Sequence, residues 1–252
     1  MATDASPALD RGPAKMSEGS RLLGVFFEPG KTFADIAERP SWLVPLLIGI
    51  LSAVLLIYLF NRHVGWESIL QRAMDNNRFV QQLPPEQRQI AFDRQLRLIP
   101  VFSYLGAILG FPITLLLAAG LATGIIRGLL GTPIRFVQAF AAMAYAFLPR
   151  VIYAGLSISV MFLKNPDEFD LQNAFASNPG AFMDPQKSSR FLYTVASQLD
   201  VFSIWVILLV AVGLKAAGGK RLSFGGALFA VVLPWAVYVL VRGGLAAAGL
   251  GG

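Results

Sequence analysis

Residues 98–126 read LIPVFSYLGAILGFPITLLLAAGLATGII, and this stretch contains no charged side chain. An α-helix needs about 20 apolar residues to cross the ~30 Å hydrocarbon core of a bilayer. The run is longer than that, so it predicts a membrane-spanning helix. Pro100 and Pro112 predict a kink or a tilt within it, because proline removes a backbone hydrogen bond and clashes with the preceding turn.

Four further apolar runs accompany this one. They cover residues 42–60, 136–163, 198–217 and 222–241. Charged residues make up 14% of the chain, against ~25% in an average soluble protein, and they are concentrated between the runs. Because a lipid-facing helix cannot carry free charge, this distribution is expected of a multi-span protein. The sequence therefore predicts an all-α integral membrane protein with a five-span helical bundle, its membrane domain covering residues 42–249.

The composition also indicates which binding partners and which chemistry to expect. The net charge of +6 could suggest nucleic acid, but multi-span proteins keep Lys and Arg at their helix ends for topology and for lipid headgroups. We therefore expect a lipid bilayer and no nucleic acid. The absence of cysteine excludes disulfides and thiol catalysis. Residues 1–20 lack the apolar segment of a signal peptide and are predicted to be a disordered tail.

Two polar or amphipathic segments flank the first span. Residues 21–41 form an amphipathic pair of short helices, broken at Pro29-Gly30 and too short to cross a membrane. They either lie in the membrane interface or pack against the end of the bundle, and both can hold together. Residues 61–97 predict a helical extramembrane cap between the first two spans, with a helix start near Pro85. The cap is too short for a core of its own, which favours a lid or contact surface over an enzyme domain.

The second span carries glycines at intervals of four residues. Small residues at this spacing let helix backbones approach closely, and such packing holds membrane bundles together. The pattern therefore predicts a helix–helix contact. Packing within the chain is the favoured interpretation, and dimerisation is the alternative. The glycines concerned are Gly106, Gly110, Gly120, Gly124 and Gly128.

The third run is interrupted in its middle by Pro149-Arg150. An arginine near the centre of a bilayer costs about 2.5–3.5 kcal/mol on insertion scales, and such residues usually face the bundle interior. Asp200 lies at the start of the fourth span. One hypothesis is that Arg150 and Asp200 approach each other across two helices. The alternative is that Arg150 snorkels or binds the carbonyls that Pro149 leaves free.

Motifs for catalysis or cofactor binding are weak. Gly30-Lys31-Thr32 resembles the end of a P-loop, but Val25 occupies the position of the required first glycine. His63 is the sole histidine, and the acidic residues 167–170 lack the spacing of a calcium loop. The sequence therefore predicts no catalytic, cofactor-binding or metal-binding residue, and we expect a protein that is not an enzyme.

The orientation in the membrane follows from the short loops, in which Lys and Arg mark the cytoplasmic side. Basic residues are dense in the second and fourth of the turns between spans. This places the N-terminus in the cytoplasm and the C-terminus outside. The residues are Arg127, Arg135, Lys215, Lys220 and Arg221.

Several short motifs resemble the Yip domain family. The family's entry helix has a Pro-x-x-Thr-Phe pattern, matched by Pro29, Thr32 and Phe33, and then a Pro-x-Trp, matched by Pro40 and Trp42. A Pro-Leu at Pro45 opens the first span, and residues 145–149 (YAFLP) are similar to the family's Tyr-x-x-Leu-Pro. Residues 83–87 (LPPEQ) resemble bacterial members.

The resemblance implies five spans with a cytoplasmic N-terminus. Eukaryotic Yip proteins bind Rab-type GTPases and form complexes with relatives. The short tail and the long helical first segment depart from that pattern and argue against GTPase binding here. We expect a non-enzymatic scaffold in the inner membrane of a bacterium, which binds other membrane proteins or itself or organises the membrane. The alternative is a small permease or channel with a polar path at Pro149-Arg150.

Overall fold

The computed structural model describes residues 15–75, 77–166, 169, 174–184 and 187–249. The described residues form helices, turns and links, and no strand occurs among them. Five helices in the described part of the chain are long and apolar enough to cross a membrane, which confirms the predicted all-α, five-span class. The protein is therefore an integral, multi-pass membrane protein. In chain order these spans are Leu43–His63, Pro85–Gly128, Phe136–Leu163, Val201–Arg221 and Phe224–Ala247.

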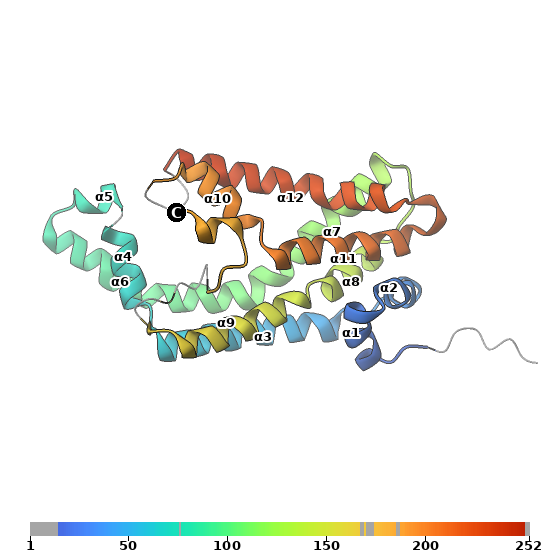
Figure 1. The fold of residues 1–252 in the computed structure, drawn as a ribbon, viewed down its shortest axis with the longest axis horizontal. Helices are drawn as coiled ribbons and strands as arrows, with labels where there is room; N and C mark the ends of the chain where they lie inside the picture. The colour runs from blue at the N-terminus through green and yellow to red at the C-terminus, as the bar shows by residue number, and fades with distance from the viewer. Residues whose placement is uncertain (1–14, 76, 167–168, 170–173, 185–186, 250–252) are drawn as a thin grey trace, which may run out of the picture.

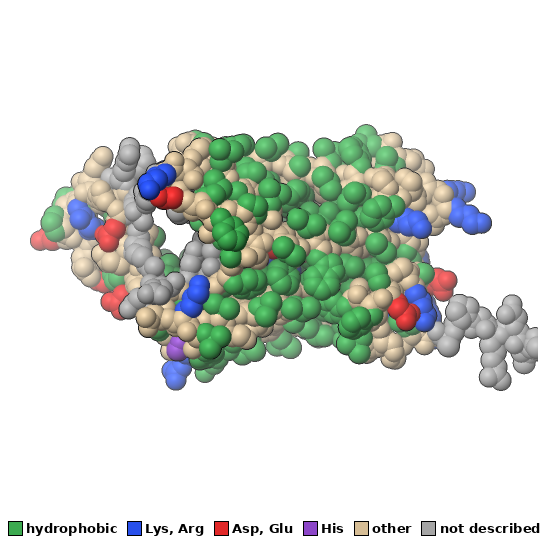
Figure 2. All heavy atoms as spheres, viewed as in Figure 1, with side chains coloured by type: hydrophobic (Ala, Val, Ile, Leu, Met, Phe, Trp, Pro, Cys, Tyr) green, Lys and Arg blue, Asp and Glu red, His purple; other side chains and the backbone are tan. Residues whose placement is uncertain are grey.

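On the face shown in Figure 2, apolar side chains cover the middle of the molecule, and charged side chains lie mainly at its two ends. Leu51 on the first span and Leu117 on the second are each 65% exposed, and Leu240 on the last is 56% exposed. A soluble protein rarely exposes so large an apolar surface. In this protein the apolar belt is the surface that faces lipid.

The second span is part of a single helical rod that also supplies the cap. Helix α6 (Pro85–Leu105) continues through a π-helical turn, η1 (Gly106–Gly110), into α7 (Phe111–Gly128). The widened turn lies directly before Pro112, whose missing N–H breaks the α-helical pattern of hydrogen bonds. The cap also contains α4 (Glu67–Asp75) and α5 (Arg78–Gln81), at the opposite end of the molecule from α1 (Glu18–Phe27) (Figure 1).

Helix α8 (Phe136–Ala146) lies at the centre of the bundle. Every residue from Ala139 to Ala146 is buried, and most are alanine, which allows neighbouring helices to come close. Its neighbours include α7, which directly precedes it in the chain. They also include α2 (Pro29–Glu38), near the start of the chain, and α11 (Val201–Gly218), near its end. The third span continues after a break as α9 (Pro149–Leu163), which packs along α3 (Leu43–His63).

The first two helices form a hairpin, which we call the N-terminal hairpin (residues 18–38). Helix α1 (Glu18–Phe27) starts at Glu18, within the residues expected to be a tail, and Ser17 caps it by accepting a hydrogen bond from Ser20 N–H. Helix α2 then packs against α8 and α11 (Figure 1). Of the two arrangements left open, packing against the end of the bundle is therefore present.

The segment before the fourth span folds back onto the bundle. Helix α10 (Arg190–Gln198) packs along α12 (Phe224–Ala247), where Phe191 lies against Gly243. Before it, a 3₁₀ turn, η3 (Pro179–Phe182), contacts α10. The Val201 N–H donates to the Ser177 carbonyl at 3.1 Å, which fixes the start of α11 against this returning segment.

Candidate functional site

Two helices of the bundle begin at the same place, and each start carries a charged residue. Pro149 is in the first turn of α9, where its missing N–H costs nothing, and Arg150 follows it. Asp200 caps α11, with Oδ1 accepting from the N–H groups of Phe202 and Ser203 at 3.0 Å each. Arg150 Nη1 lies 3.4 Å from Asp200 Oδ1. The predicted approach of Arg150 and Asp200 is thus confirmed.

The environment of this ion pair is asymmetric. The Asp200 side chain is 11% exposed, whereas the Arg150 side chain is 45% exposed. The Arg150 guanidinium also lies over the ring of Tyr153, 5.1 Å from its centroid, where a cation–π attraction holds it. Neither the cavity lined by Trp42 and Phe140 nor the cavity along α6 is lined by Arg150 or Asp200. The pair ties the starts of α9 and α11 together.

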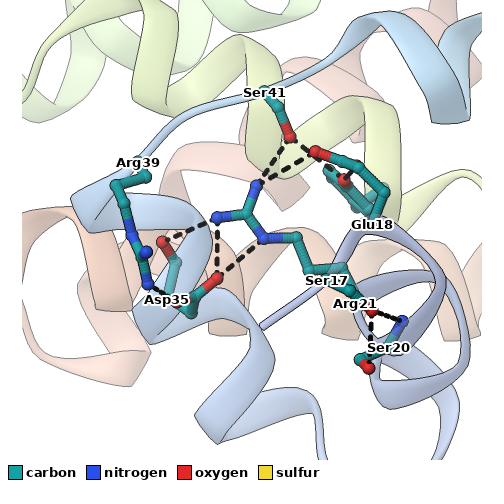
Figure 3. A network of polar contacts seen from close by, with 8 residues as sticks. Ser17, Glu18, Ser20, Arg21, Asp35, Arg39 and Ser41 are labelled. Atoms are coloured by element: carbon teal, nitrogen blue, oxygen red, sulfur yellow. Dashed lines mark hydrogen bonds and ion pairs between the residues drawn. The ribbon is translucent and has the colours of Figure 1, made fainter. Parts of the chain in front are cut away.

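A second cluster of polar side chains holds the N-terminal hairpin to the bundle (Figure 3). Arg21 of α1 is only 5% exposed. Its Nε donates to Asp35 Oδ2 at 2.7 Å, and its Nη1 donates to Ser41 Oγ at 2.7 Å. Asp35 is also bound by Arg39 from the end of α2. The Arg21 guanidinium thus lies between Asp35 on one side and Ser41 and Glu18 on the other (Figure 3).

Tyr145 connects this cluster to the central helix. Its side chain is fully buried in α8, and its hydroxyl lies 3.1 Å from Ser41 Oγ and donates to a carboxylate oxygen of Glu18. Glu18 and Ser41, which precede Tyr145 by 127 and 104 positions in the chain, therefore meet at the Tyr145 hydroxyl. We call Glu18, Arg21, Asp35, Ser41 and Tyr145 the hairpin network.

The charges in this network stabilise one another. Burial alone would raise the pKa of Asp35, but the hydrogen bond and the positive charge of Arg21 outweigh it. The pKa of the Asp35 carboxyl is therefore held below its ordinary value. Two arginines, Arg21 and Arg39, face two carboxylates, Glu18 and Asp35. The network joins α1, α2, the link before α3, and α8, and its polar groups form hydrogen bonds and ion pairs with one another.

Close packing adds to the polar contacts at the hairpin. A Cβ atom placed on Gly213 of α11 would lie 2.7 Å from the Ala142 Cβ and 2.9 Å from Phe33 Cδ1. Phe33 and Thr32 are both fully buried, and Gln138 Nε2 of α8 donates to the Ala37 carbonyl at 2.7 Å. The hairpin is thus seated against α8 and α11 without space for a further methyl group at Gly213.

The motif residues singled out in the sequence surround this seat. Pro29 starts α2, and Pro40 lies in the link to α3. Trp42 packs edge-on against Phe140 of α8 with 5.4 Å between ring centroids. Pro45 is buried in the first turn of α3. The hairpin network itself was not predicted, although Tyr145 was part of a quoted motif.

The prediction that the glycines of the second span pack within this chain is wrong. A Cβ atom on each of these glycines would meet no atom of the described residues within 4 Å. The opposite face of α7 packs inward instead, through Leu115, Ala119, Ala122, Thr123 and Ile126. A four-residue spacing places small residues on one face, but it does not say whether that face meets the same chain. The open positions are Gly106, Gly110, Gly120, Gly124 and Gly128.

The two remaining sequence features are the single histidine and the acidic run 167–170. His63 lies at the end of α3 against Phe162, with 4.6 Å between ring centroids. Of the acidic run 167–170, Asp167, Glu168 and Asp170 lie outside the described residues. Phe169 is fully buried in a small apolar cluster with Phe60 and Met161.

The comparisons with known proteins agree with this architecture. Residues 23–245 match the family model described as Yip1 domain. The match begins within α1 and ends within α12, so it covers most of the hairpin, the cap, the first four spans and nearly all of the last span. Neither the curated proteins nor the solved structures gave a match.

Proposed function

The chain belongs to the Yip1 domain family, and from this premise we propose that it is a non-enzymatic membrane scaffold that binds membrane partners along one face of α7. The partner is another membrane protein or a second copy of this chain. We call the face defined by Gly120, Gly124 and Gly128, together with Gly106 and Gly110 of the preceding turn, the glycine face.

The open glycine face is the observation that carries this proposal. A glycine within a helix costs about 1 kcal/mol relative to alanine, and no contact within the described residues offsets that cost at these positions. In lipid, helices associate through close packing at small residues, because apolar association gives no advantage over contact with acyl chains. Exposed leucines flank the glycines, with Leu117 65% and Leu121 56% exposed. Together they form a groove-and-ridge surface suited to a second helix.

The permease alternative has less support. Asp200 neutralises the charge of Arg150, and the pair lines neither the cavity at Trp42 and Phe140 nor the cavity along α6. A transport path would need a hydrated route to this charge.

The proposed orientation places the hairpin end in the cytoplasm. The α7–α8 and α11–α12 turns lie at the same end as the hairpin (Figure 1), and Thr132 Oγ1 donates to the Arg221 carbonyl at 3.2 Å between the two turns. This end therefore combines the basic residues of both short loops, as expected of a cytoplasmic side. The C-terminus then lies outside, and the expected membrane is a bacterial inner membrane.

The test compares two exposed glycines in the full-length protein. Gly124→Leu fills the glycine face, whereas Gly244→Leu adds the same side chain to an open position on α12. Both variants should keep the helical circular dichroism spectrum of the parent and should unfold cooperatively on heating. Affinity capture in mild detergent, with light scattering for self-association, should show a stoichiometric partner that Gly124→Leu loses and Gly244→Leu retains. Capture without a stoichiometric partner, or retention by Gly124→Leu, would contradict the proposal.

A further inference from the structure

An apolar groove opens on the outside of the bundle between α3 and α7, and α8 forms its floor. Its volume is about 300 Å³. Every side chain that lines it is apolar or aromatic. These side chains are Trp42, Leu46, Pro112, Leu116, Phe136, Val137 and Phe140.

The groove starts at the boundary between membrane and water. Trp42 is the residue before α3 and Phe136 is the first residue of α8, so both lie where their spans enter the bilayer. Trp42 is 37% exposed, as suits an aromatic residue at headgroup level. Phe140 packs against Trp42 with 5.4 Å and against Phe136 with 6.1 Å between ring centroids. These rings give one wall of the groove a rigid aromatic surface.

Farther along α3, toward the middle of the membrane, the groove closes. A Cβ atom on Gly49, one turn beyond Leu46, would lie 2.7 Å from Cε1 of Phe111, the residue before Pro112. Helices α3 and α7 are therefore in direct contact at this point. The groove is thus open toward the headgroups and closed at depth, which is the shape of a seat for one acyl chain.

The open end of the groove is positively charged. Arg135 is exposed and directly precedes Phe136, at the N-terminus of α8. Its backbone N–H is bound by Gln138 Oε1 at 2.9 Å, which fixes the backbone at this position. The N-terminus of an α-helix carries a partial positive charge, which adds to that of the guanidinium. A lipid headgroup with a net negative charge complements this end. A zwitterionic headgroup gains less, because its cationic choline offsets the charge of its own phosphate.

We propose that this groove holds one acyl chain of an anionic phospholipid whose phosphate lies at Arg135. The lining residues of α7, Pro112 and Leu116, precede Gly120 at the same four-residue spacing, so the groove adjoins the glycine face along one side of α7. The bound lipid would cover the junction of α3, α7 and α8 beside the hairpin. This goes beyond the scaffold function and does not depend on it.

Trp42 provides a fluorescent reporter inside the groove. In the full-length protein, replacing Trp66, Trp205 and Trp235 with phenylalanine leaves Trp42 as the single tryptophan. This protein is reconstituted in phosphatidylcholine vesicles that contain a minor fraction of brominated phosphatidylglycerol or of brominated phosphatidylcholine. We expect phosphatidylglycerol to quench Trp42 with about fivefold higher relative affinity, the factor expected for one basic residue near an anionic lipid.

Three matched proteins control this measurement. Arg135→Gln should abolish the preference for phosphatidylglycerol, and Leu116→Phe, which fills the groove, should reduce quenching by both lipids. A chain whose single tryptophan is Trp235, on α12, should be quenched equally by both lipids. Equal quenching of Trp42 by the two lipids, or no effect of Arg135→Gln, would overturn the proposal.

Native mass spectrometry in the parent background gives a second readout, in case the tryptophan replacements disturb folding. The parent should retain one phosphatidylglycerol more strongly than phosphatidylcholine through detergent exchange, and Arg135→Gln should not. Equal retention by both proteins would also overturn the proposal.

Discussion

Arg150 and Asp200 are 50 residues apart in the chain and form an ion pair, with Nη1 and Oδ1 3.4 Å apart, at the point where α9 and α11 begin. The two charges are not equivalent. A carboxylate at a helix N-terminus is favoured by the helix dipole, whereas an arginine there is disfavoured. Asp200 therefore stabilises its own helix and also compensates the unfavourable position of Arg150.

The first prediction separates these two roles of Asp200. Asp200→Ala removes both the N-cap and the charge, and it should lower the free energy of unfolding by about 1–2 kcal/mol. Asp200→Asn keeps a side-chain oxygen that accepts from Phe202 and Ser203, so it should cost less. Thermal unfolding in detergent measures both variants. Equal losses from the two would show that the cap contributes nothing.

A double-mutant cycle with Arg150→Gln isolates the ion pair itself. Because the Arg150 side chain is 45% exposed, the coupling energy with Asp200→Asn should not exceed ~1 kcal/mol. A coupling of several kcal/mol would mean that the pair is shielded from water and lipid headgroups far more than this exposure indicates.

The second prediction concerns the hairpin network. Asp35→Ala leaves Arg21 buried without its main counter-charge, and breaking a buried pair in this way costs about 3–5 kcal/mol. The lower value is expected, because Glu18 and Ser41 remain beside Arg21. Glu28→Gln is the matched control, since it removes an ion pair to Lys31 whose side chains are 60% and 71% exposed. Thermal unfolding and protease sensitivity of the hairpin should change in Asp35→Ala and stay unchanged in Glu28→Gln.

The third prediction is the pH dependence of hairpin docking. The pKa of Asp35 is lowered in the folded protein, so its contribution is present above its ordinary pKa of about 3.9 and is lost as the pH falls through the folded value. The hairpin should therefore stay docked from neutral pH down to about pH 4 and loosen only below that.

Spin labels can follow this docking directly. The chain has no cysteine, so cysteines introduced at Lys31 and Lys220 are the only labelling sites for a distance between the hairpin and the α11–α12 turn. A second pair at Arg135 and Lys220 lies outside the hairpin and should not change. A widening of the Lys31–Lys220 distance between pH 7 and pH 5 would mean that groups other than Asp35 control docking.

The spans and the Arg150–Asp200 pair could be predicted because isolated charges in apolar runs are conspicuous. Asp200 begins one apolar run and Arg150 interrupts another, so few other partners were available in the membrane. The hairpin network gave no such signal. Arg21 belongs to an amphipathic helix whose polar side is normally solvated, and Tyr145 is one aromatic residue within an apolar run. Only the folded chain shows that they meet.

The glycines show a different limit of sequence reasoning. Helical spacing indicates which residues share a face, but not what that face contacts. On α7 the alanines Ala119 and Ala122 pack inward while Gly120 and Gly124 face out. In contrast, Gly213 has no glycine partner at this spacing, yet it has the close contacts that the repeated glycines lack.

The last prediction uses this contrast between the two kinds of glycine. Gly213→Ala introduces a methyl group that would lie 2.7 Å from the Ala142 Cβ and 2.9 Å from Phe33, so α2, α8 and α11 must move apart. Overpacking of this kind costs about 1–3 kcal/mol. Gly124→Ala meets no atom of the described residues within 4 Å, and the better helix propensity of alanine favours it by up to ~1 kcal/mol. Thermal unfolding of the two variants in the same detergent should therefore shift the midpoint in opposite directions. If Gly124→Ala instead destabilised the purified protein, its methyl group would be displacing a second copy from the glycine face, and the loss would grow with protein concentration.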